Sequence, residues 1–330
     1  MNRTVTVVCN HEYGNPDEVI RIESWELPPL EPNSVLVEQK ASPINPADLN
    51  LIEGRYLLRP PLPVIPGIEG VGVISEIGND VDGLTIGQPV IAPNRIGFWC
   101  EAYITDADTL IPLPPEIPVE QAAMLSVNAP TAWWMLTDYV SLEPGDWIIQ
   151  NAANSGVGRY IIQLARHRSL KTLNVVRRSE LISELESEGA DVVVTDEVPL
   201  SKQIRDLIGD DEAKLGLNAV GGDSAHEIAK SLAAHGTLVT YGAMGLQPLQ
   251  IANGLLIFKD IRFRGFMLSH RSNRTASEEI QEMFRHIFAL AMDRKLKAPI
   301  AKTYPLTAAR EALAHAAQGR RNGKVLFVMD

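Results

Sequence analysis

The stretch Gln150-Asn-Ala-Ala-Asn-Ser-Gly-Val-Gly158 decides the fold of this chain, because it lies where an apolar strand passes into a helix. The residues Asp146-Trp-Ile-Ile-Gln-Asn151 read as a short buried strand. After the loop, apolar residues follow with the spacing of one helix face: Val157, Ile161, Leu164 and Ala165. A small-residue loop between strand and helix brings backbone N–H groups to a pyrophosphate. The stretch therefore predicts a dinucleotide site, and proteins with such a site usually transfer hydride.

The glycine fingerprint in this loop is degenerate. When the G-x-G-x-x-G template is laid on residues 153–158, Ala153 and Ser155 take the first two glycine positions and Gly158 the last. Both replacements are small, but neither tolerates a positive φ as glycine does. On this motif alone, a strand-to-helix turn without a ligand stays an open alternative.

The end of the next strand indicates which dinucleotide is bound. Lys171-Thr-Leu-Asn-Val-Val176 is a β-type run, and Arg177, Arg178 and Ser179 follow it. Arg177 comes 19 residues after Gly158, close to the ~20 at which the adenosine ribose is met. Two arginines and a serine suit a 2′-phosphate, whereas a carboxylate would suit a 2′-hydroxyl. We therefore predict NADPH, with a solvated basic strand end as the alternative.

Composition limits the classes of partner and the compartment. The 330 residues, 45% hydrophobic and 22% charged, suit about two globular domains. A formal charge of −11 disfavours nucleic acid and anionic membranes as partners. Cys9 and Cys100 are too few for a disulfide framework or a four-sulfur metal site, and the seven histidines show no ligand spacing. Residues 1–10 lack a targeting pattern, and no apolar run reaches the ~18 residues of a membrane span, so we expect a cytoplasmic protein.

The pattern of elements predicts two domains of different texture. Residues 1–123 are rich in strands, turns and proline, with strands expected at 34–39, 70–77, 88–92 and 101–105. A helix is expected at 119–139. Alternating strands and helices follow at 147–151, 156–168, 171–176, 179–188, 191–195, 200–208, 215–220, 223–234 and 236–241, which indicates a parallel sheet. A last strand at 261–266 forms an edge where a second subunit can pair, so we expect a homodimer. Helices at 275–293 and 307–317 and a strand at 324–329 complete the chain.

Five segments in order carry a resemblance to a known family: Ile44-Asn-Pro-Ala-Asp-Leu-Asn-Leu-Ile-Glu-Gly-Arg-Tyr56, the loop 150–158, Asn174-Val-Val-Arg177, Val239-Thr-Tyr-Gly-Ala-Met244 and Leu255-Leu-Ile-Phe-Lys-Asp260. The chain resembles the medium-chain dehydrogenase/reductase superfamily, and within it the zinc-free mitochondrial-type trans-2-enoyl-thioester reductases, which act on enoyl-ACP or enoyl-CoA. The resemblance implies an α/β fold with a GroES-like β-rich catalytic domain (1–123 and 268–330) and a Rossmann doubly wound parallel-sheet domain that binds NADPH (124–267).

The residue types at the superfamily's zinc position argue against a metal. The zinc alcohol dehydrogenases of the superfamily that this chain resembles hold the metal with a cysteine near position 45 and a histidine in a Gly-His-Glu stretch. Here those places read Asn45 and Gly67-Ile-Glu69. A catalytic zinc needs about three good protein ligands. We therefore predict no metal and expect Glu69 to be a structural hydrogen-bonding residue.

The resemblance assigns the catalytic role to Tyr56. Hydride addition to the β-carbon of an α,β-unsaturated thioester drives negative charge onto the carbonyl oxygen. A phenol with a pKa near ~10 is a neutral donor that can stabilise the enolate or protonate the α-carbon. A tyrosine that only caps a turn after Gly54 is the structural alternative.

Further cofactor contacts are implied by the resemblance, position by position. Asn128 and Thr131 match the nicotinamide end, and Asn154, Ser155, Gly156 and Val157 match the pyrophosphate loop. Arg177, Arg178 and Ser179 match the phosphate clamp. The loop Tyr241, Gly242, Ala243 and Met244 matches the nicotinamide ribose, Phe266, Met267, Leu268 and Ser269 match the carboxamide, and Lys324 matches a terminal lysine that reaches the cofactor.

Two departures from the family pattern leave other functions open. Met267 replaces a tryptophan, and Arg271 lies where another aromatic residue is common, and both positions border the acyl pocket in the family. The sequence favours NADPH-dependent reduction of trans-2-enoyl thioesters. The alternatives are an NADPH:quinone oxidoreductase and a non-catalytic NADPH-sensing or interaction protein. The acyl carrier, ACP or CoA, stays open.

Overall fold

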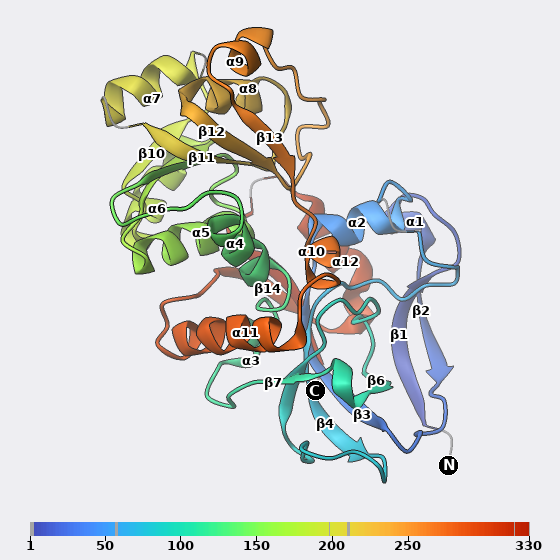
Figure 1. Ribbon diagram of the computed structural model, residues 1–330. Helices are drawn as coiled ribbons and strands as arrows, with labels where there is room; N and C mark the ends of the chain where they lie inside the picture. The colour runs from blue at the N-terminus through green and yellow to red at the C-terminus, as the bar shows by residue number, and fades with distance from the viewer. Residues whose placement is uncertain (1–2, 57–58, 198, 210–211, 320, 330) are drawn as a thin grey trace. The chain divides into compact units, whose positions relative to one another are not determined.

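The protein is described by a computed structural model over residues 3–56, 59–197, 199–209, 212–319 and 321–329 (Figure 1). The chain divides into two compact units, named here unit 1 (Met1–Val127 and Gln281–Asp330) and unit 2 (Asn128–Ile280). None of the helices in the described ranges combines the length and the apolar character that crossing a bilayer requires.

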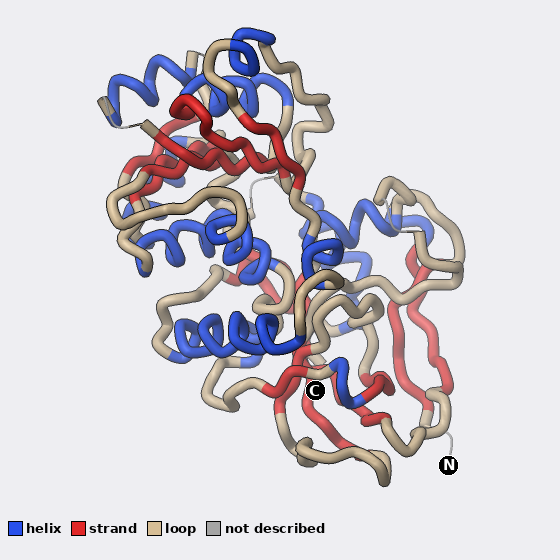
Figure 2. The backbone as a smooth tube through the Cα atoms, viewed as in Figure 1, coloured by secondary structure: helices blue, strands red, loops and turns tan. Residues whose placement is uncertain are grey.

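Unit 1 is built on two sheets joined by long irregular connections (Figure 2). The larger has seven strands in the order β14-β15-β3-β4-β5-β7, with β6 paired to β3, and the smaller pairs β1 with β2 antiparallel. The strands are β1 Thr4–Asn10, β2 Ile20–Glu26, β3 Ser34–Pro43, β4 Val71–Ile77, β5 Pro89–Ile91, β6 Ala102–Asp106, β7 Ile111–Pro112, β14 Ile300–Tyr304 and β15 Lys324–Val328. The helices are α1 Pro16–Val19, α2 Pro46–Ile52, α3 Val119–Ala122 and α12 Ala309–Ala317, with 3-10 turns Ala107–Thr109 and Leu306–Ala308.

Strand β1 contributes to two apolar clusters because its side chains alternate between two faces. Val5, Val7 and Cys9 pack into a cluster with β3 and β6. Val8 packs into a second cluster, with α12 and β15. The sequence analysis did not predict β1 or β2, and the structure shows that β1 contributes buried side chains to both cores.

Unit 2 is a parallel six-stranded sheet with the order β10-β9-β8-β11-β12-β13. Numbered along the chain within this unit, the order is 3-2-1-4-5-6, the doubly wound Rossmann arrangement. The strands are β8 Trp147–Gln150, β9 Lys171–Val176, β10 Val192–Thr195, β11 Ala213–Asn218, β12 Leu232–Thr240 and β13 Arg262–Gly265. The helices are α4 Asn128–Thr137, α5 Gly156–His167, α6 Ile182–Glu188 after a 3-10 turn Ser179–Leu181, α7 Leu200–Ile208, α8 Gly222–Ser231, α9 Asn253–Ile257 and α10 Leu268–Ser272, while α11 Ser277–Met292 continues into unit 1.

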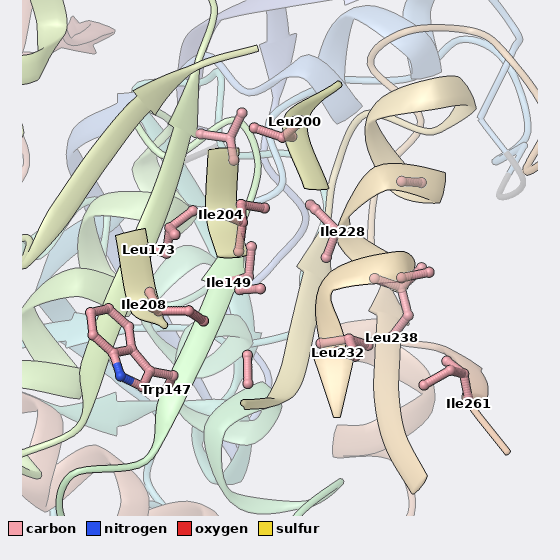
Figure 3. Packing of buried hydrophobic residues seen from close by; sticks show 14 of the residues in the cluster. Trp147, Ile149, Leu173, Leu200, Ile204, Ile208, Ile228, Leu232, Leu238 and Ile261 are labelled. Atoms are coloured by element: carbon pink, nitrogen blue, oxygen red, sulfur yellow. The ribbon is translucent and has the colours of Figure 1, made fainter. Parts of the chain in front are cut away.

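An apolar layer between this sheet and helices α7 and α8 forms one of the apolar clusters of unit 2 (Figure 3). Helix α7 turns Leu200, Ile204 and Ile208 toward the sheet at a spacing of four residues, which places them on one helix face. They pack in one cluster with Ile149 and Leu238 from the strands. Full burial of each such side chain contributes roughly 1.5–3 kcal/mol, so this layer holds the strand ends at fixed positions.

The long helix predicted at 119–139 is wrong in one respect, because the structure has two helices, α3 and α4, with a break between them. Pro130 explains the break. Its ring clashes with the carbonyl four residues earlier in a continuous helix, but it is tolerated in a first turn. Helix α4 starts at Asn128, which places Pro130 in that first turn.

The division into units also differs from the predicted domain boundaries. Residues 124–127 lie in unit 1 and residues 268–280 in unit 2. The second difference has a local cause, because Arg271 anchors its segment to α4. Its guanidinium donates to Asp138 at 2.5 Å and lies 5.0 Å from the ring centroid of Trp134. It also donates to Glu279 at 2.7 Å, so the segment from 271 to 279 is held within unit 2.

Candidate active site

The loop after β8 reaches helix α5 through one left-handed residue. That residue is Ala152, with φ +49°, whereas Ser155 has φ −71°. Ser155 is the N-cap of α5, and its hydroxyl accepts the Gly158 N–H at 3.1 Å. The two template positions without glycine, Ala153 and Ser155, therefore do not carry the positive φ.

Gly158 is required because α5 starts directly against the loop. A Cβ at this position would lie 2.5 Å from the carbonyl oxygen of Ala153 and 2.8 Å from that of Ala152. No side chain fits at such distances. The retained glycine of the template therefore lets the helix N-terminus approach the strand end closely, which directs its N–H groups toward the loop.

A network of neutral amides lies beneath this loop. Gln150 donates to the Gly158 carbonyl at 2.9 Å and to the Asn174 side chain at 2.7 Å. Asn151 donates to Asn218 at 2.9 Å and accepts the N–H of Ala219 at 2.7 Å. The network ties together the ends of β8, β9 and β11 without placing a charge there.

This network was not predicted from the sequence, although the sequence contains a signal for it. A polar amide stands near the end of three otherwise apolar strands, in Trp147-Ile-Ile-Gln-Asn151, Leu173-Asn-Val-Val176 and Leu215-Gly-Leu-Asn218. An amide that is fully buried must find partners. Since parallel strands end at one edge of the sheet, the four amides of these three adjacent strands, Gln150, Asn151, Asn174 and Asn218, are the partners available to one another.

Arg159 is a buried charge that links the loop to α6. Its side chain is 1% exposed, donates to Glu184 at 2.7 Å and also pairs with Glu188. Its Nε donates to the Asn154 carbonyl at 3.3 Å. The pyrophosphate-loop candidate Asn154 is thus braced by the helix that follows the Arg177–Ser179 segment.

The predicted phosphate clamp lies at the same sheet edge as the loop. Arg177 and Ser179 are exposed and Arg178 is partly buried, directly after β9. Strands β8 and β9 are paired in register, with Gln150 opposite Asn174, so their loops leave adjacent strands. Asp196, at the end of β10, is near enough for Arg177 to lower its pKa, although burial is the larger effect and raises it.

The remaining candidates of unit 2 follow β12 and β13 or lie on α4. The Tyr241 N–H donates to the Asn218 carbonyl at 3.0 Å, and Met244 N–H to that of Ala219 at 2.9 Å. Phe266 N–H donates to the Thr240 carbonyl at 2.9 Å, which starts the segment through Met267, Leu268 and Ser269. Asn128 and Thr131 are both buried in α4.

Two features of this edge fit a bound dinucleotide. The buried Tyr241 hydroxyl has no hydrogen-bond partner within the described residues, and burial raises the pKa of this phenol, which the neighbouring Ser155 opposes. A Cβ on Gly242 would lie 3.0 Å from the Ala219 carbonyl oxygen, so this position also requires close backbone approach. The loops after β8, β11 and β12 therefore leave a backbone-lined edge with an available hydroxyl at the switch point of the sheet.

Tyr56, in unit 1, follows the turn that ends α2. Gly54 takes φ +70°, and the N–H of Tyr56 donates to the Asn50 carbonyl at 3.0 Å. The phenol is half-buried, and burial raises its pKa, with the carboxylate of Asp48 as the second cause. Tyr56 is therefore a neutral hydrogen-bond donor at neutral pH.

A buried polar cluster adjoins this helix, named here the Asn45 cluster (Asn45, Asp48, Glu69 and Lys324). The Asn45 amide donates to Glu69 at 2.8 Å, and its backbone N–H donates to Asp48 at 2.7 Å. The Lys324 ammonium donates to the Asn45 side-chain oxygen. The second Glu69 oxygen accepts the Val127 N–H at 3.0 Å, so Glu69 is the structural hydrogen-bonding residue that was expected.

Burial dominates the electrostatics of the Asn45 cluster. It raises the pKa of Asp48 to about 7, against the opposing hydrogen bond from the Asn45 backbone. It lowers the pKa of Lys324, which the nearby Glu69 carboxylate opposes. Lys324 is 7% exposed and lies on β15 in unit 1. The Lys324 side chain donates to Asn45 in the structure. Its contact with the cofactor stays a prediction.

Two family models match the chain, an alcohol dehydrogenase GroES-like domain over residues 31–116 and a zinc-binding dehydrogenase over residues 156–289. The residues in the described ranges do not fit the zinc that the second description implies. At the place of the superfamily's cysteine and histidine ligands stand Asn45 and Ile68, and the Lys324 ammonium already donates to the Asn45 oxygen that a cation would need.

Similar proteins of known name cover nearly the whole chain. The chain is 41% identical over 316 residues to the mitochondrial enoyl-[acyl-carrier-protein] reductase of Mus musculus, which covers 93% of this chain and 83% of the mouse protein. The human protein of that name is 38% identical and covers 94% of this chain and 85% of its own length.

Solved structures show the same likeness. The complex of Etr1p with NADP and crotonyl-CoA has a TM-score of 0.89 and 30% identity, covering 99% of this chain and 100% of that one. A quinone oxidoreductase from Pseudomonas syringae pv. Tomato DC3000 has a TM-score of 0.88 and 25% identity, covering 98% and 99%. The GroES-like and Rossmann domains, the near-complete match to enoyl reductases and the Etr1p fold lead to one conclusion: the chain belongs to the enoyl thioester reductases of the medium-chain dehydrogenase/reductase superfamily.

Proposed function

We propose that this protein reduces the C2=C3 double bond of trans-2-enoyl thioesters with NADPH. The observation that carries the proposal is the state of Tyr56. The phenol is half-buried, its pKa is raised, and it stands in a unit whose metal position is taken by an asparagine and an ammonium. A neutral phenol is the group such a reaction needs in place of a Lewis acid.

NADPH binding is assigned to the carboxyl edge of the unit 2 sheet. The N-terminus of α5, with Ser155 as its cap, is suited to the pyrophosphate because its N–H groups and dipole favour an anion. Arg177 and Arg178 are suited to the 2′-phosphate. When bound, NADPH supplies the hydride, and the role of unit 2 is to hold and orient it.

The role proposed for Tyr56 is to stabilise and protonate the reduced thioester. As negative charge develops on the thioester carbonyl oxygen, the phenolic O–H donates to that oxygen or delivers its proton to the α-carbon. Burial is the main cause that raises the pKa of Tyr56 and keeps the proton on the phenol, and the negative charge of Asp48, when ionised, adds to this effect.

Replacing Tyr56 with phenylalanine tests this function directly. With crotonyl-CoA as substrate, NADPH oxidation followed by absorbance is expected to slow by roughly 10²–10⁴-fold. The matched control is Tyr304→Phe, a buried tyrosine of the same unit whose hydroxyl lies 3.1 Å from His315. A wild-type rate of NADPH oxidation in the Tyr56 variant would show that Tyr56 is not catalytic. If the wild-type protein oxidised NADPH with none of the enoyl thioesters, the proposed function would be wrong.

The same assay identifies the electron acceptor, an enoyl thioester or a quinone, and the acyl carrier, CoA or ACP. Enoyl-CoA substrates of increasing length, the matching enoyl-ACP substrates and benzoquinones are compared at equal concentration. We propose the thioesters as substrates, on CoA or ACP, because relatives bear the name enoyl-[acyl-carrier-protein] reductase and Etr1p was solved with crotonyl-CoA. Quinone reduction without enoyl reduction would support the second candidate function, which the likeness to a quinone oxidoreductase favours.

The preference for NADPH over NADH is assigned to Arg177 and Arg178. Hydrogen bonds to charged groups contribute about 1.5–3 kcal/mol each. The double replacement with alanine is therefore expected to weaken NADPH binding strongly and leave NADH binding almost unchanged, as measured by titration of each nucleotide. Equal losses for both nucleotides would contradict the assignment.

A homodimer through the β13 edge forms part of the proposal. Strand β13 ends the parallel sheet, and the segment before it carries six of the eleven exposed large apolar side chains in the described residues: Met244, Leu246, Leu249, Leu256, Ile257 and Phe258. Phe258 is 85% exposed. Exposed apolar groups beside an open sheet edge are typical of a subunit interface.

Light scattering after gel filtration tests the dimer. Ile257→Glu with Phe258→Glu is expected to give monomers, whereas Ile86→Glu, at an equally exposed apolar position of unit 1, keeps the wild-type mass. A wild-type monomer would contradict the proposal. Cytoplasmic location remains a proposal as well, and cell fractionation checks it.

A further inference from the structure

Three metal-ligand side chains that the proposed reaction does not use gather on the small sheet of unit 1. Cys9 is near the end of β1, and His11 follows it by two residues. Glu23 lies on β2 opposite Val7, whose side chain shares the face of Cys9. Alternation along β1 and antiparallel pairing with β2 thus bring a thiol, an imidazole and a carboxylate to one place.

The distances between the ligand atoms are close to those of a coordination sphere. Cys9 Sγ lies 4.0 Å from His11 Nε2, which lies 2.8 Å from Glu23 Oε1, and the three ligand atoms are all within 4.8 Å of one another. Around a tetrahedral zinc ion, the metal–ligand lengths imply about 3.6 Å for sulfur to nitrogen and about 3.3 Å for nitrogen to oxygen. For these two pairs, shifts of about half an ångström connect the observed arrangement with the coordinated one.

We propose that Cys9, His11 and Glu23 bind one transition-metal ion of the zinc class. Thiolate, imidazole and carboxylate are the protein ligands that Zn²⁺ takes, and three of them leave a fourth position for water. The thiolate selects against Mg²⁺ and Ca²⁺, which prefer oxygen ligands. This site is separate from the superfamily's zinc position, which Asn45 and Ile68 occupy here.

The surroundings of the three side chains support a metal site. Trp25 Nε1 donates to Glu23 Oε2 at 2.9 Å, and this hydrogen bond orients the carboxylate. The other oxygen, Oε1, lies 2.8 Å from His11 Nε2. Such outer hydrogen bonds are typical of metal ligands. The Cys9 side chain is buried, while those of His11 and Glu23 are 52% and 33% exposed, so an ion can reach the thiol from the solvent side.

The charge balance of binding is simple. Burial raises the pKa of Cys9 to about 12, so the thiol is protonated before the ion arrives. Binding breaks the S–H bond, forms the metal–sulfur bond and releases one proton to solvent, with no change in oxidation state. Arg21, opposite Cys9 on β2, is engaged by the main-chain carbonyls of Glu18 and Ile20.

A bound ion would join β1 to β2. These strands form a sheet of only two strands, an arrangement with little stability of its own. Because a ligand that binds only the folded state stabilises that state, the melting temperature is expected to rise with zinc concentration. The rise is expected in the absence of NADPH and substrate, so it does not depend on the proposed function.

Cobalt titration of the chelator-treated full chain, followed by absorbance, tests the proposal. One equivalent of Co²⁺ is expected to give a thiolate-to-cobalt charge-transfer band that Zn²⁺ abolishes. Cys9→Ser is expected to remove the band, and His11→Ala to weaken binding by roughly 10-fold or more. Cys100→Ser is the matched control, since Cys100 is the other buried cysteine and its thiol donates to the Gly97 carbonyl.

Two results would overturn the site. The first is the absence of a thiolate band in wild type. The second is a band that survives in Cys9→Ser or is lost equally in Cys100→Ser. Circular dichroism checks that each variant is folded, and because the His11 side chain is exposed, His11→Ala remains informative even where Cys9→Ser is unstable.

Discussion

Unit 1 and unit 2 each bury a polar assembly, but the two assemblies differ in charge. Under the loop of unit 2, Gln150, Asn151, Asn174 and Asn218 are neutral amides joined to one another and to main-chain groups. The Asn45 cluster of unit 1 contains two carboxyl groups and an ammonium around a single amide. Both arrangements give most of their buried polar atoms hydrogen-bond partners, and each leaves one side-chain oxygen without one among the described residues, on Gln150 and on Asp48. Only the second arrangement contains groups whose charge changes with pH.

The difference suits the chemistry proposed for each unit. Below an anionic cofactor, neutral amides hold strand ends in place without adding to or opposing the cofactor charge, whatever the pH. Near Tyr56, burial is the main cause that raises the pKa of the phenol, and the charge of Asp48 raises it further. Ionisable groups are therefore buried in the unit that is proposed to transfer a proton. Neutral amides are buried in the unit whose proposed role is to position the cofactor.

The largest expected effect comes from removing the cation of the charged assembly. Lys324→Met leaves Glu69 and Asp48 without their nearest positive charge, and breaking a buried pair costs about 3–5 kcal/mol. Urea unfolding is expected to show this loss. Lys302→Met, on the exposed part of β14, is the control. An unchanged unfolding midpoint for Lys324→Met would mean that the cluster is not held by charge.

The next effect concerns Arg159, a buried charge that contacts the loop above the neutral amides. Arg159→Met removes hydrogen bonds to Glu184 and to the Asn154 carbonyl. Hydrogen bonds to charged groups contribute about 1.5–3 kcal/mol. We expect lower stability together with weaker NADPH binding, measured by unfolding and by nucleotide titration. Loss of stability with unchanged affinity would show that Arg159 holds α6 but does not position the loop.

A charge placed inside the amide network of unit 2 tests whether that network has to be neutral. Asn218→Asp keeps the acceptor for the Val220 and Gly221 N–H groups but loses the donor to Thr240. Leaving that hydroxyl without its donor costs about 1–3 kcal/mol. NADPH affinity, measured by nucleotide titration, is expected to fall, because a carboxyl with an ordinary pKa near ~3.9 is ionised at neutral pH and repels the anionic cofactor. An affinity equal to that of the wild type would contradict the need for neutrality.

Per unit of pH, the smallest effect is the pH dependence of the charged assembly. The pKa of Asp48 is raised to about 7 in the folded chain, above its unfolded value, so the folded state holds the proton more tightly. Its contribution to stability is therefore present at low pH and is lost as pH rises toward about 7, by up to ~1.4 kcal/mol per pH unit. Urea unfolding from pH 4 to pH 7 measures this slope, which Asp48→Asn is expected to flatten.

The sequence was sufficient for the parts of the fold that follow local rules. Helix α7 was predicted at 200–208, where Leu200, Ile204 and Ile208 repeat at helical spacing, and strand β9 was predicted from its β-type run. The position of the loop before α5 was also predicted. The break between α3 and α4 was missed because apolar character continues through it, and only the ring of Pro130 sets where the second helix begins.

The parts of the site that depend on distant contacts could not be predicted in the same way. Lys324 follows Asn45 by hundreds of residues in the chain, and only the pairing of β15 with β3 brings these segments together. Similarly, Glu23 meets Cys9 and His11 through the register of β1 with β2. Spacing along the chain carries no signal for such meetings.

The left-handed Ala152 has a consequence for engineering heat tolerance. An alanine in this conformation costs about 1–2 kcal/mol that a glycine does not, so the folded chain already contains a strained residue before any cofactor arrives. Ala152→Gly would relax that strain, but it would also let the loop sample many more shapes when empty. A substitution that raises the stability of the folded chain at this position would therefore lower its affinity for the nucleotide. Ala152 is the residue at which stability and affinity oppose each other.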